Sequence, residues 1–409
     1  MKTPLQDRCI LLGVTGSIAA YKAAELASKL TQAGCRVEVI LTQAALQFIT
    51  PLTFQSVTGQ RAYTDADLWG REGHVRHIGL GQSGDLLVVA PASANTIAKL
   101  AHGIADNLLT VTALAARCPL MLAPAMDAGM YAHPATQANL DILRQRGAIV
   151  IGPLEGHLAS GLVGLGRMVE PAELMGHIRL VLARGGSLEG RKVVVTAGGT
   201  QEPLDPVRFL ANRSSGKQGY ALAQAALDRG AEVVLISAPT HLNPPSGARC
   251  VQVNTAQEML ESVLAELPQT DVLIMAAAVA DFRPIAPADY KIKRGSEVPE
   301  VRLEATPDIL AAVAEFKQRT HLPRLTIGFA AETHDLLTYA RIKLQAKKLD
   351  MLVANDITAP DAGFAVDTNR VILLDARGGE EHLPLLSKAE VADRILERVV
   401  ALLQEQKSD

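Results

Sequence analysis

The sequence predicts two doubly wound α/β domains, each with a Rossmann-like, mainly parallel sheet. Three observations support this fold class. The chain has 409 residues, which exceeds the length of one ordinary domain. Short apolar runs alternate with helical patterns in both halves, and each half contains a strand that ends in a glycine-rich turn before a helix. A predicted helix at 172–183, followed by Arg184-Gly185-Gly186-Ser187, indicates the junction between domains at 1–187 and 188–409.

The first half opens with an apolar strand at 9–14, which meets the turn Gly13-Val14-Thr15-Gly16-Ser17 and then a helix predicted at 18–33. Strands separated by helices build a parallel sheet. The further strands of this half are predicted at 37–41, 85–90, 120–123 and 148–151.

The second half repeats this order and contains the most informative turn. The run at 193–196 is β-branched and continuous, as a strand covered on both faces requires. Gly198-Gly199 turns the chain, and Ser214-Ser215-Gly216 offers backbone N–H groups and hydroxyls at the start of the next helix. About twenty residues separate strand and helix, more than an ordinary βα connection needs, so we interpret this region as a phosphate-binding turn. The strands are predicted at 192–197, 232–237, 272–275, 326–329 and 351–354, with helices at 256–267, 309–317 and 335–348.

Composition restricts the setting of the protein. A net charge of -3 without a basic cluster argues against a nucleic acid or an anionic membrane as the main partner. The most apolar run, at 272–280, is too short to span a bilayer, and no charged-then-apolar leader opens the chain. The four cysteines have no C-x-x-C spacing, so we expect reduced, buried thiols in a cytoplasmic protein.

Neither standard nucleotide fingerprint is present. Gly13, Gly16 and Ala19 have the wrong spacing for a dinucleotide loop, and Thr42 stands where an acidic residue would hold a ribose. A hydroxyl there suits a phosphate better, which favours a cofactor with one phosphate. The segment at 215–218 resembles the end of a P-loop but lacks its earlier glycine and its final Ser or Thr.

Several long motifs nevertheless resemble known families. In the first half, Gly16-Ser17-Ile18-Ala19-Ala20-Tyr21-Lys22, the segment at 91–96 and the segment at 124–131 resemble the flavin-containing cysteine decarboxylases. In the second half, the segments at 211–217, 276–281, 291–293 and 328–333 resemble phosphopantothenate–cysteine ligase. Both halves in this order resemble the bifunctional proteins of coenzyme A biosynthesis.

For the first domain, the resemblance implies bound FMN and decarboxylation of 4'-phosphopantothenoylcysteine to 4'-phosphopantetheine. A carboxylate beside a cysteine side chain has no electron sink, so the flavin first oxidises the thiol to a thioaldehyde. Loss of CO2 then leaves an enethiolate, and the reduced flavin returns the electrons. The residues that would surround the flavin are Gly16, Ser17, Thr42, Ser93, Ala94 and Asn95.

The base near the substrate thiol is expected from one of two histidines, His74 and His77. His77 is the better candidate because its spacing to Ile78, Leu80 and Asp85 matches that of the family's catalytic histidine, whereas His74 does not. A surface helix or a metal pair would be the alternative, although no third ligand with suitable spacing lies nearby.

Two positions depart from the commoner decarboxylase pattern. Asp127 replaces an asparagine, and Ser160 replaces a proton-donating cysteine. A serine hydroxyl is a far weaker acid than a thiol. We therefore expect desolvation to keep Asp127 protonated so that it can act as the acid, since an ionised Asp127 would repel the substrate carboxylate.

For the second domain, the resemblance implies a ligase that joins 4'-phosphopantothenate to cysteine through an acyl-cytidylate, using CTP and Mg2+. Lys291 would neutralise charge on the triphosphate, and Asn212 would hold the acyl intermediate. Without the resemblance, Lys291 would be a mobile surface lysine, Asn212 a turn residue, and Lys343 and Lys347 a solvated helical face. The residues implied for the CTP pocket are Met275, Ala276, Ala277, Asp281, Lys291, Pro307, Asp308, Ile309, Leu310, Phe329, Lys343 and Lys347.

Two other functions fit the departures at Asp127 and Ser160. The first domain could bind flavin as a regulatory subunit without turnover, or perform oxidative decarboxylation only. The resemblance also implies a homo-oligomer, with trimers of the flavin domain joined through dimers of the ligase domain. No pattern in the sequence distinguishes CTP from ATP.

Overall fold

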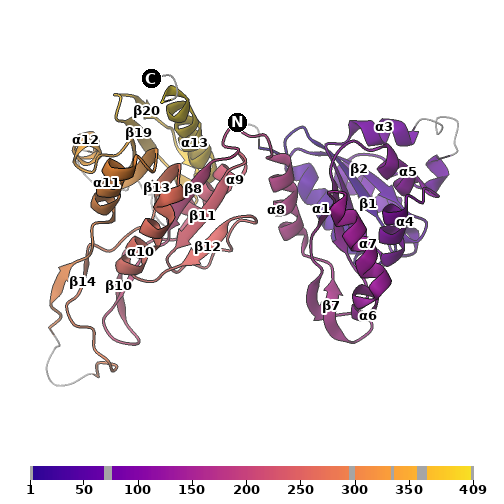
Figure 1. The fold of residues 1–409 in the computed structure, drawn as a ribbon, viewed down its shortest axis with the longest axis horizontal. Helices are drawn as coiled ribbons and strands as arrows, with labels where there is room; N and C mark the ends of the chain where they lie inside the picture. The colour runs from indigo at the N-terminus through magenta and orange to yellow at the C-terminus, as the bar shows by residue number, and fades with distance from the viewer. Residues whose placement is uncertain (1–2, 69–75, 294–299, 333–335, 357–365, 407–409) are drawn as a thin grey trace. The chain divides into compact units, whose positions relative to one another are not determined.

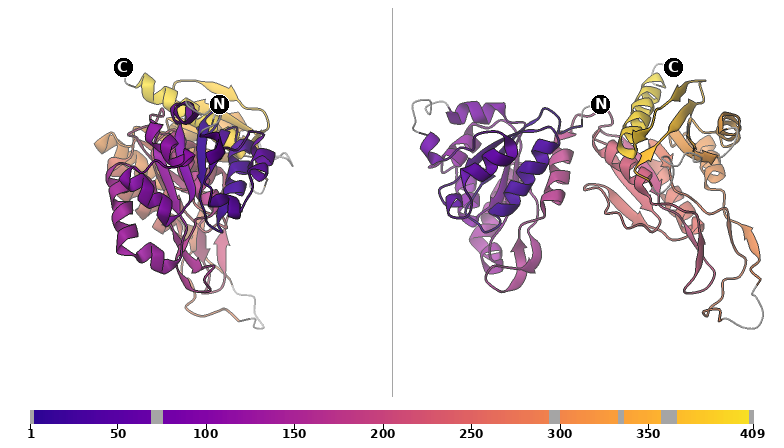
Figure 2. Two further views of the ribbon diagram at one scale, coloured as in Figure 1. Left: turned by 90° about the vertical axis from the view of Figure 1, so that its right-hand side faces the viewer. Right: turned by 180° about the vertical axis from the view of Figure 1, so that it is seen from behind.

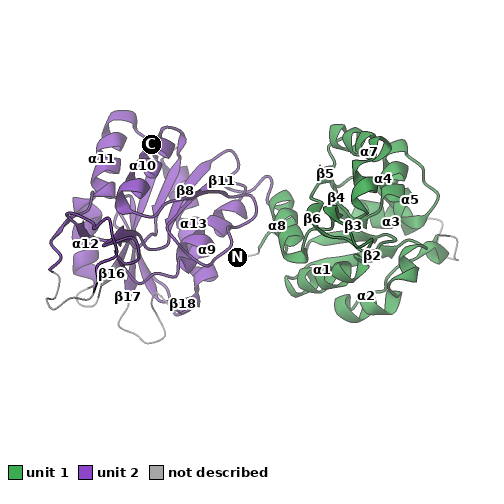
Figure 3. Cartoon of the chain, turned by 90° about the horizontal axis from the view of Figure 1, so that it is seen from below, with its two compact units in different colours: residues 1–182 green, residues 183–409 purple. Residues whose placement is uncertain are grey.

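The computed structural model describes residues 3–68, 76–293, 300–332, 336–356 and 366–406. The chain divides into two compact units, residues 1–182 and 183–409, shown in green and purple in Figure 3. Residues 183–187, which we assigned to the first domain, therefore fall in the second unit. None of the helices in these ranges has the length and apolarity needed to cross a membrane.

Unit 1 contains a five-stranded parallel sheet with the strand order β2-β1-β3-β4-β5. This is the order of a doubly wound sheet, in which the winding reverses between β1 and β3. All residues of β1 are buried, which explains its continuous apolar sequence. The strands are β1 (Cys9–Val14), β2 (Arg36–Leu41), β3 (Leu86–Ala92), β4 (Leu120–Pro124) and β5 (Ile149–Val150).

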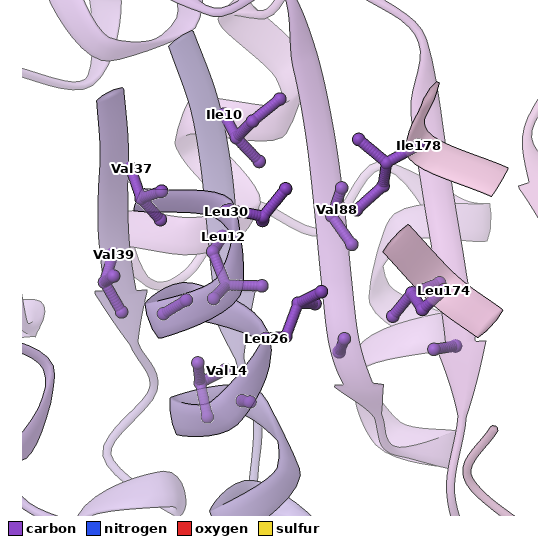
Figure 4. Close-up of a cluster of buried hydrophobic side chains, with 14 of the residues drawn as sticks. Ile10, Leu12, Val14, Leu26, Leu30, Val37, Val39, Val88, Leu174 and Ile178 are labelled. Atoms are coloured by element: carbon purple, nitrogen blue, oxygen red, sulfur yellow. The ribbon is translucent and has the colours of Figure 1, made fainter. Parts of the chain in front are cut away.

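Helices cover both faces of this sheet (Figures 1 and 3). Ile10, Leu12 and Val14 pack on one face against α1, α2 and α8, as the side chains in Figure 4 show for α1 and α8. Cys9 and Leu11 point to the other face, toward α3, α4, α5 and α7. The helices are α1 (Ala20–Gln32), α2 (Pro51–Thr58), α3 (Arg76–Ser83), α4 (Ala94–His102), α5 (Leu108–Ala115), α6 (Ala128–Ala132), α7 (Pro134–Gln145) and α8 (Pro171–Leu182).

An antiparallel hairpin of β6 (Leu154–His157) and β7 (Val163–Arg167) follows the sheet of unit 1. The sequence pattern predicted no element for this segment. The backbone N–H of Met126 donates to the carbonyl of Gly166, so the hairpin is fastened beside the end of β4. A Cβ at Gly166 would lie 2.2 Å from the carbonyl oxygen of Met126, which explains why this position is glycine.

Unit 2 contains an eight-stranded sheet with the order β12-β11-β8-β13-β16-β17-β19-β20. Its six parallel strands follow the Rossmann order, and the winding reverses between β8 and β13. β19 and β20 add an antiparallel edge that the sequence analysis missed. The strands are β8 (Lys192–Ala197), β11 (Glu232–Ser237), β12 (Arg249–Gln252), β13 (Val272–Met275), β16 (Leu325–Glu332), β17 (Met351–Asp356), β19 (Val371–Asp375) and β20 (Glu380–His382).

In unit 2, α10 and α11 pack on one face of the sheet and α9 and α13 on the other (Figures 2 and 3). α12 packs against β16 and β17. The side chains of Ser387 and Glu390 form a capping box at the start of α13. The helices are α9 (Lys217–Leu227), α10 (Ala256–Glu266), α11 (Ile309–Thr320), α12 (Leu336–Ala346) and α13 (Lys388–Glu405).

Three small antiparallel pairs accompany this sheet, and none was expected. β14 and β10 lie below the sheet in the view of Figure 1. The pairs are β9 (Gln201–Pro203) with β10 (Phe209–Ala211), β14 (Phe282–Pro284) with β15 (Leu303–Ala305), and β18 (Thr368–Asn369) with β21 (Leu386–Ser387).

The structure confirms two doubly wound α/β units with mainly parallel sheets. The predicted strands 9–14, 192–197, 232–237 and 272–275 match the observed bounds. Residue 335, where we began one helix, lies outside the described residues. The cysteines are free, but only Cys9 and Cys35 are buried, whereas Cys118 and Cys250 are partly exposed. Burial raises the pKa of Cys35 to about 11, so this thiol is unreactive near neutral pH.

Candidate functional sites

The first cavity lies in unit 1 where the winding of the sheet reverses. It has a volume of about 360 Å3. Gly16 and Ser17 follow β1, Ser93 and Ala94 follow β3, and all four line this cavity. The segment after β4 and the β6–β7 hairpin close its other side. Ligands of doubly wound proteins bind at this place because the loops diverge there.

Thr15 connects the two loops at the reversal point. Its fully buried hydroxyl donates to the carbonyl of Pro91 at 2.7 Å and accepts the N–H of Ser93 at 2.9 Å. The Ser93 side chain in turn accepts the N–H of Thr96 and caps α4. The N-terminus of α4 is thereby fixed at the cavity, where its dipole favours a negatively charged group. Sequence reasoning missed Thr15, although it lies within the first glycine turn.

Apolar side chains form much of the remaining wall. Ile18, Tyr21 and Met130 line the cavity and are 60%, 62% and 52% exposed. Met126 and Met168 also line it. Large exposed apolar groups at the mouth of a cavity indicate a surface that a ligand or a partner covers. The methionine side chains can also adapt to a flat aromatic ring.

The six residues expected around the flavin fall into two groups. Gly16, Ser17, Ser93 and Ala94 line the cavity. The Thr42 hydroxyl is instead buried, donates to the carbonyl of Val14 at 3.4 Å and accepts the N–H of Ala45. Asn95 is exposed on the first turn of α4 and does not line the described cavity. The roles of Thr42 and Asn95 therefore stay predictions.

Asp127 and Ser160 contact each other across this cavity. The Ser160 hydroxyl donates to Oδ2 of Asp127 at 2.7 Å, and the N–H of Gly129 donates to Oδ1 at 2.9 Å. These hydrogen bonds lower the pKa of Asp127, with the Ser160 hydroxyl as the largest cause. We expected desolvation to keep Asp127 protonated, and that expectation is wrong for the ligand-free chain because the carboxylate is solvated and accepts hydrogen bonds.

His77 lies on α3 and does not line the described cavity. Its Nδ1 atom is buried and has no hydrogen-bond partner among the described residues. His74, the weaker candidate, lies outside the described residues. The catalytic role of His77 stays a prediction. Within one copy of unit 1, His77 and Asp127 do not line the same described cavity.

The second cavity lies in unit 2 at the corresponding reversal between β8 and β13, and has a volume of about 610 Å3. Hydrogen bonds fix the loop at 276–281 that forms its centre. The N–H of Ala277 donates to the Thr196 hydroxyl at 3.1 Å, and the N–H of Ala280 donates to the Thr200 hydroxyl at 2.9 Å. The Asn212 side chain donates from Nδ2 to the carbonyl of Val279 at 2.9 Å, which joins the long glycine-rich turn to this loop.

One end of this cavity is lined by the start of α11 and by lysines of α12. Lys343 donates to the carbonyl of Phe329 at 3.1 Å, and Lys347 forms an ion pair with Asp308, the N-cap of α11. Burial acts to raise the pKa of Asp308, but the hydrogen bond from Lys347 and the N–H of Ala311 lower it overall. These interactions hold this end of the cavity in place, and it carries the ammonium groups of Lys343 and Lys347.

The expected nucleotide residues line this cavity with one exception. Lys291 is exposed and does not line it. The buried carboxylate of Asp205 accepts the N–H of Ile292 at 3.1 Å and also binds the N–H groups of Val207 and Arg208. Asp205 therefore fixes the segment that carries Lys291. The residues expected from the sequence that do line the cavity are Asn212, Met275, Ala276, Ala277, Asp281, Pro307, Asp308, Ile309, Leu310, Phe329, Lys343 and Lys347.

Sequence reasoning missed the opposite end of the cavity. Lys217 and Gln218 at the start of α9, Asn355 on β17, Asn369 on β18 and Lys388 at the start of α13 line it. The Ser214-Ser215-Gly216 turn could have indicated Lys217, whereas Lys388 has no local signal because it is the first residue of an ordinary amphipathic helix. Among the described residues, no group of three or more His, Cys, Asp or Glu side chains could hold a metal ion.

Both units match known protein families. Residues 1–182 match the family described as Flavoprotein, and residues 188–403 match the family described as DNA/pantothenate metabolism flavoprotein C-terminal domain. The coenzyme A biosynthesis bifunctional protein CoaBC of Bacillus subtilis is 46% identical over 401 residues, which cover 97% of this chain and 98% of that protein. The protein of the same name from Vibrio cholerae is 44% identical over 395 residues, covering 96% and 98%.

Solved structures match the units separately. The C-terminal domain of a coenzyme A biosynthesis bifunctional protein CoaBC aligns with a TM-score of 0.46 and 42% identity, covering 54% of this chain and 99% of that one. A PPC decarboxylase mutant complexed with pantothenoylaminoethenethiol aligns with a TM-score of 0.40 and 35% identity, covering 43% and 98%.

We predict that Ser160→Ala raises the pKa of Asp127 toward the ordinary value of a carboxyl group, because the mutation removes the hydrogen bond that contributes most to lowering it. A carbon-detected NMR titration of aspartate side chains would measure this pKa. Ser83→Ala is the matched control because the Ser83 hydroxyl donates to the Leu80 carbonyl and contacts no carboxylate in the described hydrogen bonds. An unchanged pKa in Ser160→Ala would show that the pair does not form in solution.

Proposed function

This chain belongs to the family of coenzyme A biosynthesis bifunctional proteins, and from this premise we propose that its two cavities carry the family's two activities in sequence. Unit 2 joins 4'-phosphopantothenate to cysteine with CTP, and unit 1 decarboxylates the resulting 4'-phosphopantothenoylcysteine to 4'-phosphopantetheine. The observation that carries this proposal is the pair of cavities at the two reversal points, each lined by motif residues. The product of one unit is the substrate of the other.

We propose FMN as the cofactor of unit 1, and the residues present fit it. The capped N-terminus of α4 can hold a single phosphate, with Ser17 and Ser93 as neighbouring hydroxyl groups. Ile18, Met126 and Met130 provide an apolar wall for the flavin ring. When bound, the flavin supplies an oxidation of the substrate thiol that permits loss of CO2, followed by return of the electrons.

The residues of unit 1 divide the proton transfers between them. We propose that His77 accepts the substrate thiol proton, and its buried Nδ1, which has no hydrogen-bond partner among the described residues, supports this role. Asp127 and Ser160 together return a proton to the enethiolate carbon. Substrate binding displaces water from Asp127, so the carboxylate takes up one proton from solvent, and the Ser160 hydroxyl relays that proton to the carbon while Asp127 returns to its ionised form. The free chain's ionised Asp127 is the resting state of this pair.

In unit 2, the substrate carboxylate attacks the α-phosphate of CTP, and pyrophosphate leaves. The cysteine amine then attacks the acyl-cytidylate, and CMP leaves with the bonding electrons. Lys291 neutralises the charge that develops on the leaving pyrophosphate. Asn212, fixed by the carbonyl of Val279, holds the acyl intermediate. Lys343, Lys347, Phe329 and the start of α11 surround the nucleotide.

Mg2+ enters with the triphosphate in this proposal, and Asp281 is the acidic side chain of the central loop at 276–281. We further propose a cytoplasmic homo-oligomer with trimers of unit 1 joined through dimers of unit 2. Two observations support contacts between copies: His77 does not line the unit 1 cavity, and Ile18 and Tyr21, which line it, are exposed.

We predict that denaturation of the purified protein releases FMN, since the capped N-terminus of α4 at the cavity suits a phosphate group. Chromatography of the released chromophore against FMN and FAD standards would identify it. Release of FAD would contradict the cofactor assignment, and so would absence of flavin from protein expressed with riboflavin in excess.

We predict that Lys291→Gln lowers the rate of amide formation by at least roughly a hundredfold, because a neutral side chain no longer stabilises the leaving pyrophosphate. Flavin content should be unchanged because unit 1 is not altered. A coupled pyrophosphate assay would measure the rate, with the exposed Lys348→Gln as the control. Ligation at the wild-type rate in Lys291→Gln would remove Lys291 from the mechanism.

We predict that Asp127→Asn stops turnover after loss of CO2, because an amide cannot deliver the proton to the enethiolate. Reduced flavin and an oxidised product should accumulate, as absorbance and mass spectrometry would show. Adding Ser160→Cys should restore 4'-phosphopantetheine by supplying a thiol as the acid. Undiminished 4'-phosphopantetheine from Asp127→Asn alone would place the acid elsewhere.

A further inference from the structure

In the described part of unit 1, two buried side-chain polar atoms have no hydrogen-bond partner. They are Nδ1 of His77 on α3 and the hydroxyl oxygen of Thr112 on α5. Thr112 is 0% exposed, so its hydroxyl is not at the surface. A buried polar group without a partner costs stability, and native proteins keep few of them. Two such atoms on two helices of the same unit therefore require an explanation.

The helices α3 and α5 lie side by side on one face of the sheet (Figures 1 and 3). Two close contacts define their register. A Cβ at Gly81 would lie 2.8 Å from the backbone carbonyl carbon of Ala115. A Cβ at Gly84, three residues later, would lie 3.4 Å from Sγ of Cys118, which is also three residues later. Because the contacts advance together along both segments, the two helices run in the same direction.

This register places His77 and Thr112 at the same level of the two helices. His77 lies four residues before Gly81, which is about one helical turn. Thr112 lies three residues before Ala115, the residue that Gly81 contacts. Residues three or four apart share one face of a helix. The two unpartnered atoms therefore belong to the same region of the interface between α3 and α5.

The Thr112 hydroxyl also differs from those of other helical threonines in unit 1. Thr31 on α1 and Thr58 on α2 donate their hydroxyls to the carbonyl oxygen four residues earlier, at 2.9 and 2.8 Å. This carbonyl is a common partner of a threonine within a helix. Among the described residues, Thr112 makes no such bond, so its oxygen can accept a hydrogen bond from a donor on α3.

We propose that Thr112 is a positioning residue for His77, whose Nδ1–H donates to the Thr112 hydroxyl oxygen when the imidazole takes up the substrate proton. This inference rests on the role proposed above for His77. A neutral imidazole carries one ring proton, so a proton held on Nδ1 leaves the lone pair on Nε2. Nε2 then accepts the proton of the substrate thiol. The resulting imidazolium carries a proton on both nitrogens, and Thr112 supplies the acceptor that the buried one needs.

An interaction made only during proton transfer affects the rate and not the binding of the substrate. It also contributes nothing to the stability of the resting chain, in which the Thr112 hydroxyl has no described partner. Replacing an unpaired buried hydroxyl by a methyl group of the same shape is close to neutral or stabilising. A structural role for Thr112 would instead show as a loss of stability. The two roles can therefore be separated by measuring rate and stability on the same variant.

Stopped-flow measurement of flavin reduction by 4'-phosphopantothenoylcysteine, without oxygen, tests the proposal on the whole chain. Thr112→Val should lower the limiting rate roughly 3- to 10-fold, as expected for one neutral hydrogen bond. The half-saturating substrate concentration should change less than about twofold. Thr112→Ser keeps the hydroxyl and should restore most of the rate. The melting temperature and flavin content of Thr112→Val should equal those of the wild type.

Thr326→Val is the matched control, because Thr326 has a buried hydroxyl without a described partner but lies in unit 2. Its rate of flavin reduction should be that of the wild type. If Thr112→Val does not fold, Thr112→Ala is judged by the same criteria.

The other outcomes overturn the proposal. An unchanged limiting rate in Thr112→Val would show that the hydroxyl does not act on His77. An equal loss in Thr112→Ser would assign the effect to the shape of the side chain. A lower melting temperature that accompanies the loss of rate would assign it to folding. Absence of flavin reduction in the wild-type protein would instead refute the decarboxylase function proposed for unit 1, and the role of Thr112 with it.

Discussion

The handedness of the crossover between parallel strands is the constraint on which both sites depend. A strand, helix and parallel strand connect in a right-handed sense, so a sheet that grows in both directions from its first strand places successive helices on opposite faces. The connecting loops then diverge at the reversal point and leave a crevice at the carboxyl edge. Unit 1 has this reversal between β1 and β3, and unit 2 has it between β8 and β13. Each cavity lies at that point.

The two crevices differ in the chemistry of their walls. Methionine and exposed apolar side chains surround the cavity of unit 1, where a flavin needs an apolar surface and one phosphate site. Four lysines, Lys217, Lys343, Lys347 and Lys388, line the cavity of unit 2, which favours anionic ligands there. In unit 1, Asp127 and Ser160 share one hydrogen bond, so the two departures from the commoner family pattern contact each other.

The sequence predicted those parts of the structure that local patterns determine. Buried parallel strands such as β1 and β8 are continuous apolar runs, and their turns are rich in glycine. The antiparallel strand β20 and the β6–β7 hairpin escaped notice because exposed and half-buried strands carry little apolar signal, whereas β19 is a buried apolar run, VILLD, that was overlooked in the sequence. The contact between Asp127 and Ser160 spans 33 residues, and Lys388 meets Lys217 through tertiary packing, so neither follows from local sequence. For Thr42, the position after β2 was predicted correctly. Its hydroxyl, however, donates a hydrogen bond to the backbone carbonyl of Val14.

The central claim is that the two reversal-point sites act in sequence on one substrate. Mass spectrometry of the products formed from 4'-phosphopantothenate, cysteine and CTP by the purified protein tests it most directly. The account predicts 4'-phosphopantetheine together with CMP, pyrophosphate and CO2. Accumulation of 4'-phosphopantothenoylcysteine would instead make unit 1 a flavin-binding module without turnover, and an oxidised enethiol product would show that Asp127 and Ser160 do not return the proton. Either result would contradict the complete sequence proposed for this chain.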